Sequence, residues 1–186
     1  MLSYAAPVSN NEQDISNSNK DILLDEIGKY IDTNNHLIQT VEATKKPWEG
    51  PAVNMVHEYC RNRAEPQQQK NTIVFYFHNK GASKPFSSHT LYWRKYLEYF
   101  LLERPQLCLG QLLYHNASTC GANWHPKLKN HYSGNFWSAT CKHIVQLDPI
   151  PMNETQYVAA EMWLGKIKRG TRISSYYSAT KDLYKL

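Results

Sequence analysis

The sequence predicts an α/β fold, a single three-layer domain built around a mostly parallel sheet. The 186 residues suit one domain with a sizeable core. Residues 72–78, "TIVFYFH", form an unbroken apolar run that is typical of a strand covered on both faces. Segments with helical spacing lie on either side of this strand. In such sheets ligands bind beyond the carboxyl ends of the strands, so we expect a site there.

The first third of the chain contains two expected strands and two expected helices. A strand is expected at 2–8, and a polar loop follows over 9–20. Apolar residues at helical spacing predict a helix over 20–34, and a short strand is expected around 37–43. Proline and glycine then precede a helix expected at 50–63, which the polar hinge "AEPQQQKN" separates from the strongest strand.

The rest of the chain alternates between helical and irregular patterns. A helical pattern begins at Ser88 and runs to Pro105, and a second helix is expected over 105–115. Residues 117–137 are rich in Gly, Asn, His and Trp, which predicts loops and short strands. Further helices are expected at 139–147 and 154–165, and residues 166–186 form a basic, tyrosine-rich tail to a single domain spanning 1–186.

Charge is distributed unevenly along the chain, although the net value is only +5. Residues 1–66 carry six Lys/Arg and ten Asp/Glu, or −4, whereas residues 67–186 carry fifteen and six, or +9. A small anionic ligand such as a diphosphate would find a favourable field in the basic portion, although a solvated basic face is the plainer interpretation. No dense Lys/Arg stripe or recognised motif favours nucleic acid as a partner.

Membrane and redox signals are sparse. No apolar run reaches the ~20 residues that span a bilayer, and the start lacks a signal-peptide pattern, so cytoplasm is the default location. The cysteines include no CxxC pair, and we expect reduced, buried thiols. The sequons at Asn116 and Asn153 are about as many as chance supplies in an Asn-rich chain.

The motif "FHNKG" follows the strongest strand and offers groups that suit an anion. Lys80 would act as a point charge on phosphate, and His78 as a hydrogen-bond donor or metal ligand. Gly81 permits a tight turn with free backbone N–H groups. The alternative is an ordinary turn after a strand.

The motifs "CGANWH" and "HYSGNFW" combine amides with flat aromatic surfaces. Trp124 could stack on a sugar ring while Asn123 satisfies hydroxyl groups, although a tryptophan that plugs the core is at least as common. In the second motif, Gly134 permits close approach to the backbone and Asn135 offers paired donors and acceptors. His131 could bind phosphate or a metal, act as a base, or be purely structural.

A carboxylate in "AAEMWLGKIKRG" is the leading candidate for a general base. Glu161 lies near the start of this helical segment, in a region with few acidic residues. Its expected role is to accept a proton from a hydroxyl group. The cations at the end of the segment are favoured there by the helix dipole without any ligand.

In this order along the chain, "FYFHNKG", "WRKYLEYF", "CGANW", "HYSGNFW" and "AEMWLG" resemble the motifs of a family of predicted glycosyltransferases from algae, protists and large viruses. That family carries YFHxKG and HFSGNFWWA-like signatures, and the similarity spans residues 49–165. The resemblance implies a type A glycosyltransferase-like, Rossmann-like sheet that binds a nucleotide sugar. The amino-terminal strand and loop are short for a complete domain of that kind, which leaves open a degenerate or truncated module. It also implies that Gly134 and Asn135 line the donor sugar.

The chain departs from that pattern at two places. Enzymes of this kind use a divalent cation, Mn²⁺ or Mg²⁺, held by an Asp-x-Asp motif after an apolar strand, but the only close acid-x-acid pair here is Glu12 and Asp14 in a polar loop. Lys80, Arg94 or the cluster at 166–169 would have to neutralise the diphosphate instead. Ser138 stands where the family pattern has another tryptophan.

The hypothesis is therefore a glycosyltransferase that moves a sugar from a nucleotide diphosphate donor to a hydroxyl acceptor. Its alternative is a non-catalytic carbohydrate- or nucleotide-binding module, which the missing metal motif favours. The catalytic candidates are Glu161 and His131. The binding candidates are His78, Lys80, Gly81, Arg94, Asn123, Trp124, Gly134, Asn135 and Trp137.

Overall fold

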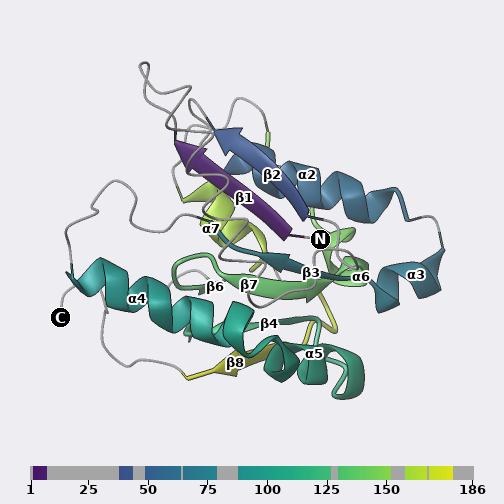
Figure 1. Ribbon diagram of the computed structural model, residues 1–186. Coiled ribbons are helices and arrows are strands. Elements are labelled where there is room, and N and C mark those ends of the chain that lie inside the picture. Colours follow the sequence, from purple (N-terminus) through teal and green to yellow (C-terminus); the bar gives the residue numbers. More distant parts are fainter. Residues whose placement is uncertain are drawn as a thin grey trace.

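A six-stranded sheet with helices packed against it forms the centre of the computed structural model (Figure 1). The strand order is β2-β1-β3-β7-β4-β8, and β5 and β6 form a separate two-stranded sheet. No helix among the described residues is long and apolar enough to span a membrane. The structure describes residues 2–7, 38–43, 49–63, 65–78, 88–126, 130–151, 158–166 and 168–177.

The central sheet is mixed. Strand β7 (Trp137–Thr140) lies antiparallel between β3 (Ile73–Tyr76) and β4 (Thr119–Ala122). The other pairings among the described strands, β1 with β2, β1 with β3 and β4 with β8, are parallel. The prediction of a three-layer, mostly parallel, Rossmann-like domain is therefore wrong. The chain passes from β4 to β7 through the β5-β6 hairpin and not through a crossover helix, so β7 enters in the opposite direction.

The amino-terminal elements agree with the sequence prediction at three places. Strands β1 (Leu2–Pro7) and β2 (Ile38–Ala43) and helix α2 (Gly50–Arg61) lie where they were expected. The predicted helix at 20–34 lies outside the described residues. The prediction of a polar hinge is wrong in part, because helix α3 (Pro66–Asn71) forms there. Pro66 sits in its first turn, where a missing N–H is tolerated.

The helical pattern from Ser88 is confirmed as α4 (Ser88–Glu98), which continues into a π-helical segment η1 (Tyr99–Glu103) and then α5 (Pro105–Tyr114). The predicted helix at 139–147 is shorter, because β7 occupies its start and α6 covers only Cys141–Ile144. Helix α7 (Ala159–Trp163) lies within the range expected for it. The tail contains a strand that was not predicted, β8 (Ile173–Tyr176). The short strands expected within 117–137 include β5 (Trp124–His125) and β6 (His131–Tyr132).

The core lies on both faces of the sheet because alternate strand residues point in opposite directions. One face packs against α2, α6 and α7 and includes Val74, Tyr76 and Trp137, which are 0 to 1% exposed. The other face packs against α4, η1 and α5. Figure 1 shows α4 and α5 on the side away from α2. Because both faces of the sheet are covered, the polar groups collect where the strands begin and end.

Two disulfides cross-link the fold, one between two helices and one between a helix and the sheet. Cys60 of α2 is bonded to Cys141 at the start of α6, and Cys108 of α5 is bonded to Cys120 of β4. The expectation of reduced thiols is therefore wrong. The sequence spacing could not reveal these pairs, because 81 residues separate the first two cysteines and the second two belong to a helix and a strand that meet only in the folded chain.

A buried histidine makes the stability of the fold sensitive to mild acid. His143 of α6 is 3% exposed, and its Nε2 lies 3.3 Å from the carbonyl oxygen of Leu164. Burial lowers the pKa of His143 below its usual value of 6.5. The unfolded chain then binds a proton more readily than the folded chain, so the stability is present above about pH 6.5 and is lost as the pH falls through the lowered pKa.

We expect the free energy of unfolding to decline as the pH falls below about 6.5, and a His143→Gln variant to lose part of that slope. Urea unfolding across this range measures both quantities. Glutamine keeps an N–H near the Leu164 carbonyl oxygen but does not titrate. Identical pH slopes for the two proteins would contradict the assignment.

Candidate functional site

One edge of the central sheet collects the motifs that the sequence singled out. Tyr76, Trp137 and Gly121 lie at the same level in neighbouring strands, as their pairing register shows. Beyond that level, β3 continues to His78, β4 continues to Asn123, and β7 is preceded by the turn at 132–135. Segments far apart in the sequence therefore leave or enter the sheet at one edge.

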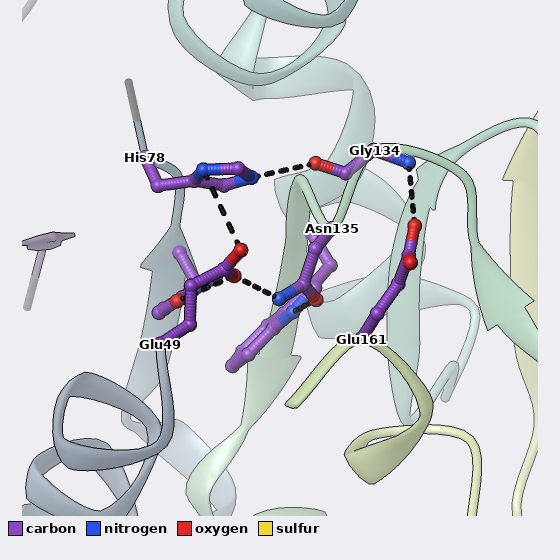
Figure 2. Close-up of polar contacts among 7 residues, drawn as sticks. Glu49, His78, Gly134, Asn135 and Glu161 are labelled. Carbon is purple, nitrogen blue, oxygen red and sulfur yellow. Dashed lines mark hydrogen bonds and ion pairs between the residues drawn. The ribbon is translucent and has the colours of Figure 1, made fainter. Parts of the chain in front are cut away.

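Glu49 is the centre of a polar cluster at this edge (Figure 2). Its Oε2 accepts hydrogen bonds from Asn135 Nδ2 at 2.6 Å and from the Tyr76 hydroxyl at 3.1 Å. Its Oε1 lies 3.7 Å from His78 Nδ1. The side chains of Glu49 and His78 are 19% and 9% exposed, so the pair reaches the molecular surface. The carboxylate joins the start of α2 to β3 and to the turn before β7.

His78 is held from both sides of its ring. Its Nε2 is 2.9 Å from the Gly134 carbonyl oxygen, which can only accept, so Nε2 carries the proton of this bond. Its Nδ1 faces Glu49, and its ring lies 5.4 Å from the ring of Phe136. Figure 2 shows the imidazole bridging Glu49 and Gly134. The geometry fixes the orientation of the ring at the end of β3.

Asn135 and Tyr76 belong to the buried side of the cluster. Asn135 is 2% exposed, and its Oδ1 accepts the indole N–H of Trp137 at 2.9 Å. Trp137 is stacked on Tyr76, with ring centroids 4.8 Å apart, and is itself 1% exposed. Burial, followed by the charge of Glu49, raises the pKa of Tyr76 well above its usual value, so the hydroxyl remains a donor. These residues position Glu49 and the turn.

Glu161 meets the same turn from another element. It lies in the first turn of α7, and its Oε1 accepts the backbone N–H of Gly134 at 3.3 Å. Gly134 thus bonds His78 through its carbonyl oxygen and Glu161 through its N–H, as Figure 2 shows. Glu161 is partly exposed. The turn therefore holds a carboxylate on one side and a histidine on the other.

The remaining candidates of the two aromatic motifs lie beside this cluster but contact one another. The backbone oxygen of Asn123 accepts the N–H of Ser133, and its Nδ2 donates to Nε2 of His125 at 3.1 Å. Trp124 packs edge to face on Tyr132, with ring centroids 4.8 Å apart. His131 lies opposite His125 in the β5-β6 pair. Their contacts place the hairpin next to the turn.

Other candidates contact other partners or lie outside the described residues. Arg94 of α4 forms an ion pair with Glu98 at 3.3 Å, one helical turn away. Lys80 and Gly81 lie outside the described residues. Of the basic cluster predicted at 166–169, Lys166, Lys168 and Arg169 are exposed, and residue 167 lies outside the described residues. The chain then reaches Arg172, whose backbone bonds Ser118 at the opposite edge of the sheet.

Ser138, which stands where the family pattern has a tryptophan, lies inside the sheet. Its side chain is fully buried in β7, and its hydroxyl donates to the carbonyl oxygen of Cys120 at 3.1 Å. Because neighbouring residues in a strand point to opposite faces, Ser138 faces away from the side to which Trp137 points. The small side chain lies in the layer that contains the Cys108–Cys120 disulfide.

The described residues do not fit a divalent metal. No three His, Cys, Asp or Glu side chains among them lie close enough to hold an ion. The oxygens of Glu49 are directed to Tyr76, Asn135 and His78, and Glu161 accepts a backbone N–H. We therefore derive no step that uses Mn²⁺ or Mg²⁺.

Gly134 is required by the geometry of the turn. Its φ is +81°, and a Cβ at this position would lie 2.6 Å from Leu97 Cδ1 of α4. We expect Gly134→Ala to lower the free energy of unfolding by about 2 to 4 kcal/mol through backbone strain and overpacking. Gly110→Ala is the matched control, because a Cβ there meets nothing within 4 Å and alanine favours its helix by about 0.5 to 1 kcal/mol. Urea unfolding of both variants measures the sign and size of each change in the free energy of unfolding. Equal changes in the two variants would contradict the special requirement for glycine at position 134.

Sequence reasoning missed Glu49 and Tyr76. Glu49 stands in "KPWEGP", directly before the helix that begins at Gly50, where a carboxylate is favoured by the helix dipole alone. Tyr76 looked like one more apolar residue of the strand. The available signal was a single acidic residue between tryptophan and glycine, and nothing local connects it to positions 27 and 86 residues away.

The fold and the site define a small mixed-sheet protein with helices on both faces, two disulfides and a carboxylate-histidine cluster at one sheet edge. Residues 8–177 match a domain family described as a domain of unknown function, DUF8361. The chain belongs to this family. Comparisons with curated proteins and with solved structures gave no match.

Proposed function

We propose that the chain is a glycosyltransferase that moves a sugar from a nucleotide diphosphate donor to a hydroxyl acceptor. The observation that carries the proposal is the attachment of Glu161 to the Gly134 N–H in the same cluster as His78. The order of the motifs along the chain, which resembles that of predicted glycosyltransferases, supports the same function. The donor and acceptor therefore meet beside the turn at 132–135.

In the proposed reaction Glu161 acts on the acceptor. Its carboxylate takes the proton of the acceptor hydroxyl as the oxygen forms a bond to the anomeric carbon. The bond between that carbon and the diphosphate oxygen breaks, and the nucleoside diphosphate leaves with the electron pair. The Gly134 N–H holds one carboxylate oxygen in place, and Glu49 and His78 hold Gly134 through the turn. Glu49 and His78 therefore act as positioning residues.

A panel of nucleotide sugars tests the proposal. The full chain is incubated with each donor and with mono- and disaccharide acceptors, and released nucleoside diphosphate and product mass are measured. We expect release that depends on the acceptor for at least one donor. Absence of release and of mass gain across the panel, with and without Mn²⁺ or Mg²⁺, would overturn the enzymatic function.

A non-catalytic carbohydrate- or nucleotide-binding module is the second candidate. The observation that favours it is the mutual satisfaction of the cluster, in which both ring nitrogens of His78 and both side-chain groups of Asn135 face protein partners. This module would bind a nucleotide or sugar, as measured by calorimetry, without any release of diphosphate. Binding with no turnover therefore supports the module.

The disulfides bear on the compartment as well as on the fold. Disulfides persist in oxidising compartments and are rare in the cytosol. Two bonds, each joining a helix to another element, favour an oxidising compartment over the cytoplasmic default. Mass measurement of the chain from its native source after alkylation of free thiols tests this. Four alkylated cysteines would contradict it.

A further inference from the structure

The segment between α5 and β4 carries an acceptor sequence for Asn-linked glycosylation that the candidate function does not use. Asn116, Ala117 and Ser118 form the sequon Asn-x-Ser, whose middle residue is not proline. Asn116 is exposed and has a φ of +54°, the left-handed conformation that commonly ends a helix, and the Ala117 N–H bonds the carbonyl oxygen of Gln111 in α5. A group attached to its side chain would therefore extend into solvent.

The surface next to Asn116 is apolar and open. Tyr114 is 82% exposed and Leu113 is 48% exposed, at the end of α5. Both lie within three residues of the sequon. A carbohydrate chain on Asn116 would cover this surface, because sugar rings pack their C–H groups against aromatic faces. The glycan itself would then cover Leu113 and Tyr114, without a partner protein.

The segment also lies where a bulky group would leave the candidate site open. The backbone of Ser118 bonds Arg172 at the start of β4 and β8, the edge of the sheet opposite to the one that leads to His78 and Gly134. In addition, the Cys108–Cys120 disulfide brackets the sequon, which links it to the oxidising conditions in which Asn-linked glycosylation takes place.

We propose that Asn116 is an Asn-linked glycosylation site and that the chain acquires a glycan there as it folds in an oxidising compartment. An oligosaccharide passes from a diphospholipid donor to Asn116 Nδ2. The bond from the anomeric carbon to phosphate oxygen breaks and the lipid diphosphate leaves with the electron pair. The carbon–nitrogen bond forms, and the amide proton passes to a base of the enzyme that transfers the oligosaccharide. In the folded chain Ser118 Oγ accepts the Arg172 N–H at 3.1 Å, so the transfer precedes this contact.

Translation of the full chain behind a cleavable secretion signal, with microsomes from a glycosylating eukaryotic cell, tests the proposal. We expect a species of higher mass that peptide N-glycosidase removes. Enzymatic release in H₂¹⁸O leaves an ¹⁸O-labelled aspartate at position 116, which peptide mass spectrometry locates. An unmodified Asn116 in translocated chain would overturn the proposal, and this readout does not require the product to be folded.

Matched variants separate the site from other effects. Asn116→Gly removes the acceptor and tolerates the positive φ, so we expect it to abolish the label at 116. Ser118→Thr keeps a hydroxyl and should keep the label. Asn153→Gln removes the other sequon and should leave occupancy of Asn116 unchanged. Loss of label in the Ser118→Thr chain, or persistence of the removable mass in a chain lacking both asparagines, would contradict the assignment.

Discussion

Replacing Cys60 and Cys141 together by alanine is expected to lower the free energy of unfolding by about 4.5 kcal/mol, the largest stability effect that the structure predicts. The reason is the size of the loop that the bond closes. Its cysteines are 81 residues apart, so the bond removes many conformations from the unfolded chain. Both residues are fully buried between α2 and α6, which adds a packing loss to the entropic one.

The Cys108–Cys120 pair provides the matched control for this prediction. It also joins a helix to another element, but its cysteines are only 12 residues apart, and its removal is expected to lower the free energy of unfolding by about 3 kcal/mol. Urea unfolding of the oxidised wild type and of the two double alanine variants gives both values. A larger loss for the Cys108 and Cys120 variant would contradict the loop-length argument.

Glu161→Gln is expected to lower turnover by about 10² to 10⁴-fold while leaving donor binding within a few-fold of the wild type. Glutamine has nearly the same shape and can still accept the Gly134 N–H through its side-chain oxygen. It cannot take up the proton of the acceptor. The change therefore separates proton transfer from the positioning of the turn. This prediction rests on the proposed glycosyltransferase function.

Turnover is measured as acceptor-dependent release of nucleoside diphosphate, and binding as calorimetric titration with the donor. Glu58→Gln is the control, because Glu58 is exposed on α2 and has no part in the cluster. Unchanged turnover in Glu161→Gln would remove the base role from this residue. Turnover and donor binding that both collapse would indicate that Glu161 supports the structure of the turn.

The local elements could largely be predicted from the sequence, whereas the order of the strands could not. Helical periodicity located α2 and α4, an unbroken apolar run located β3, and Pro105 marked the start of α5. The direction of β7 depends on a hairpin formed by pairs such as Trp124 with Tyr132, which no local pattern encodes. Strand β8 was missed because its residues are only partly buried or exposed.

For the candidate site, the motifs were visible but their connections were not. His78, Gly134 and Glu161 were singled out from residue type and position, and the structure brings them into one chain of contacts. Glu49, which lies between His78 and Asn135, was missed because its partners are distant in sequence. Trp137 was expected to touch a ligand, but it is buried and holds Asn135.

The central claim is that the sheet edge bearing His78 and Gly134 receives the nucleotide sugar. Titrating ¹⁵N-labelled chain with uridine and guanosine diphosphate sugars, and following backbone amide shifts by NMR, tests it most directly. We predict that the largest shifts fall on the amides of His78, Gly134 and Asn135. Shifts confined to the opposite edge, at Ser118 and Arg172, or no shifts at millimolar ligand, would contradict the claim.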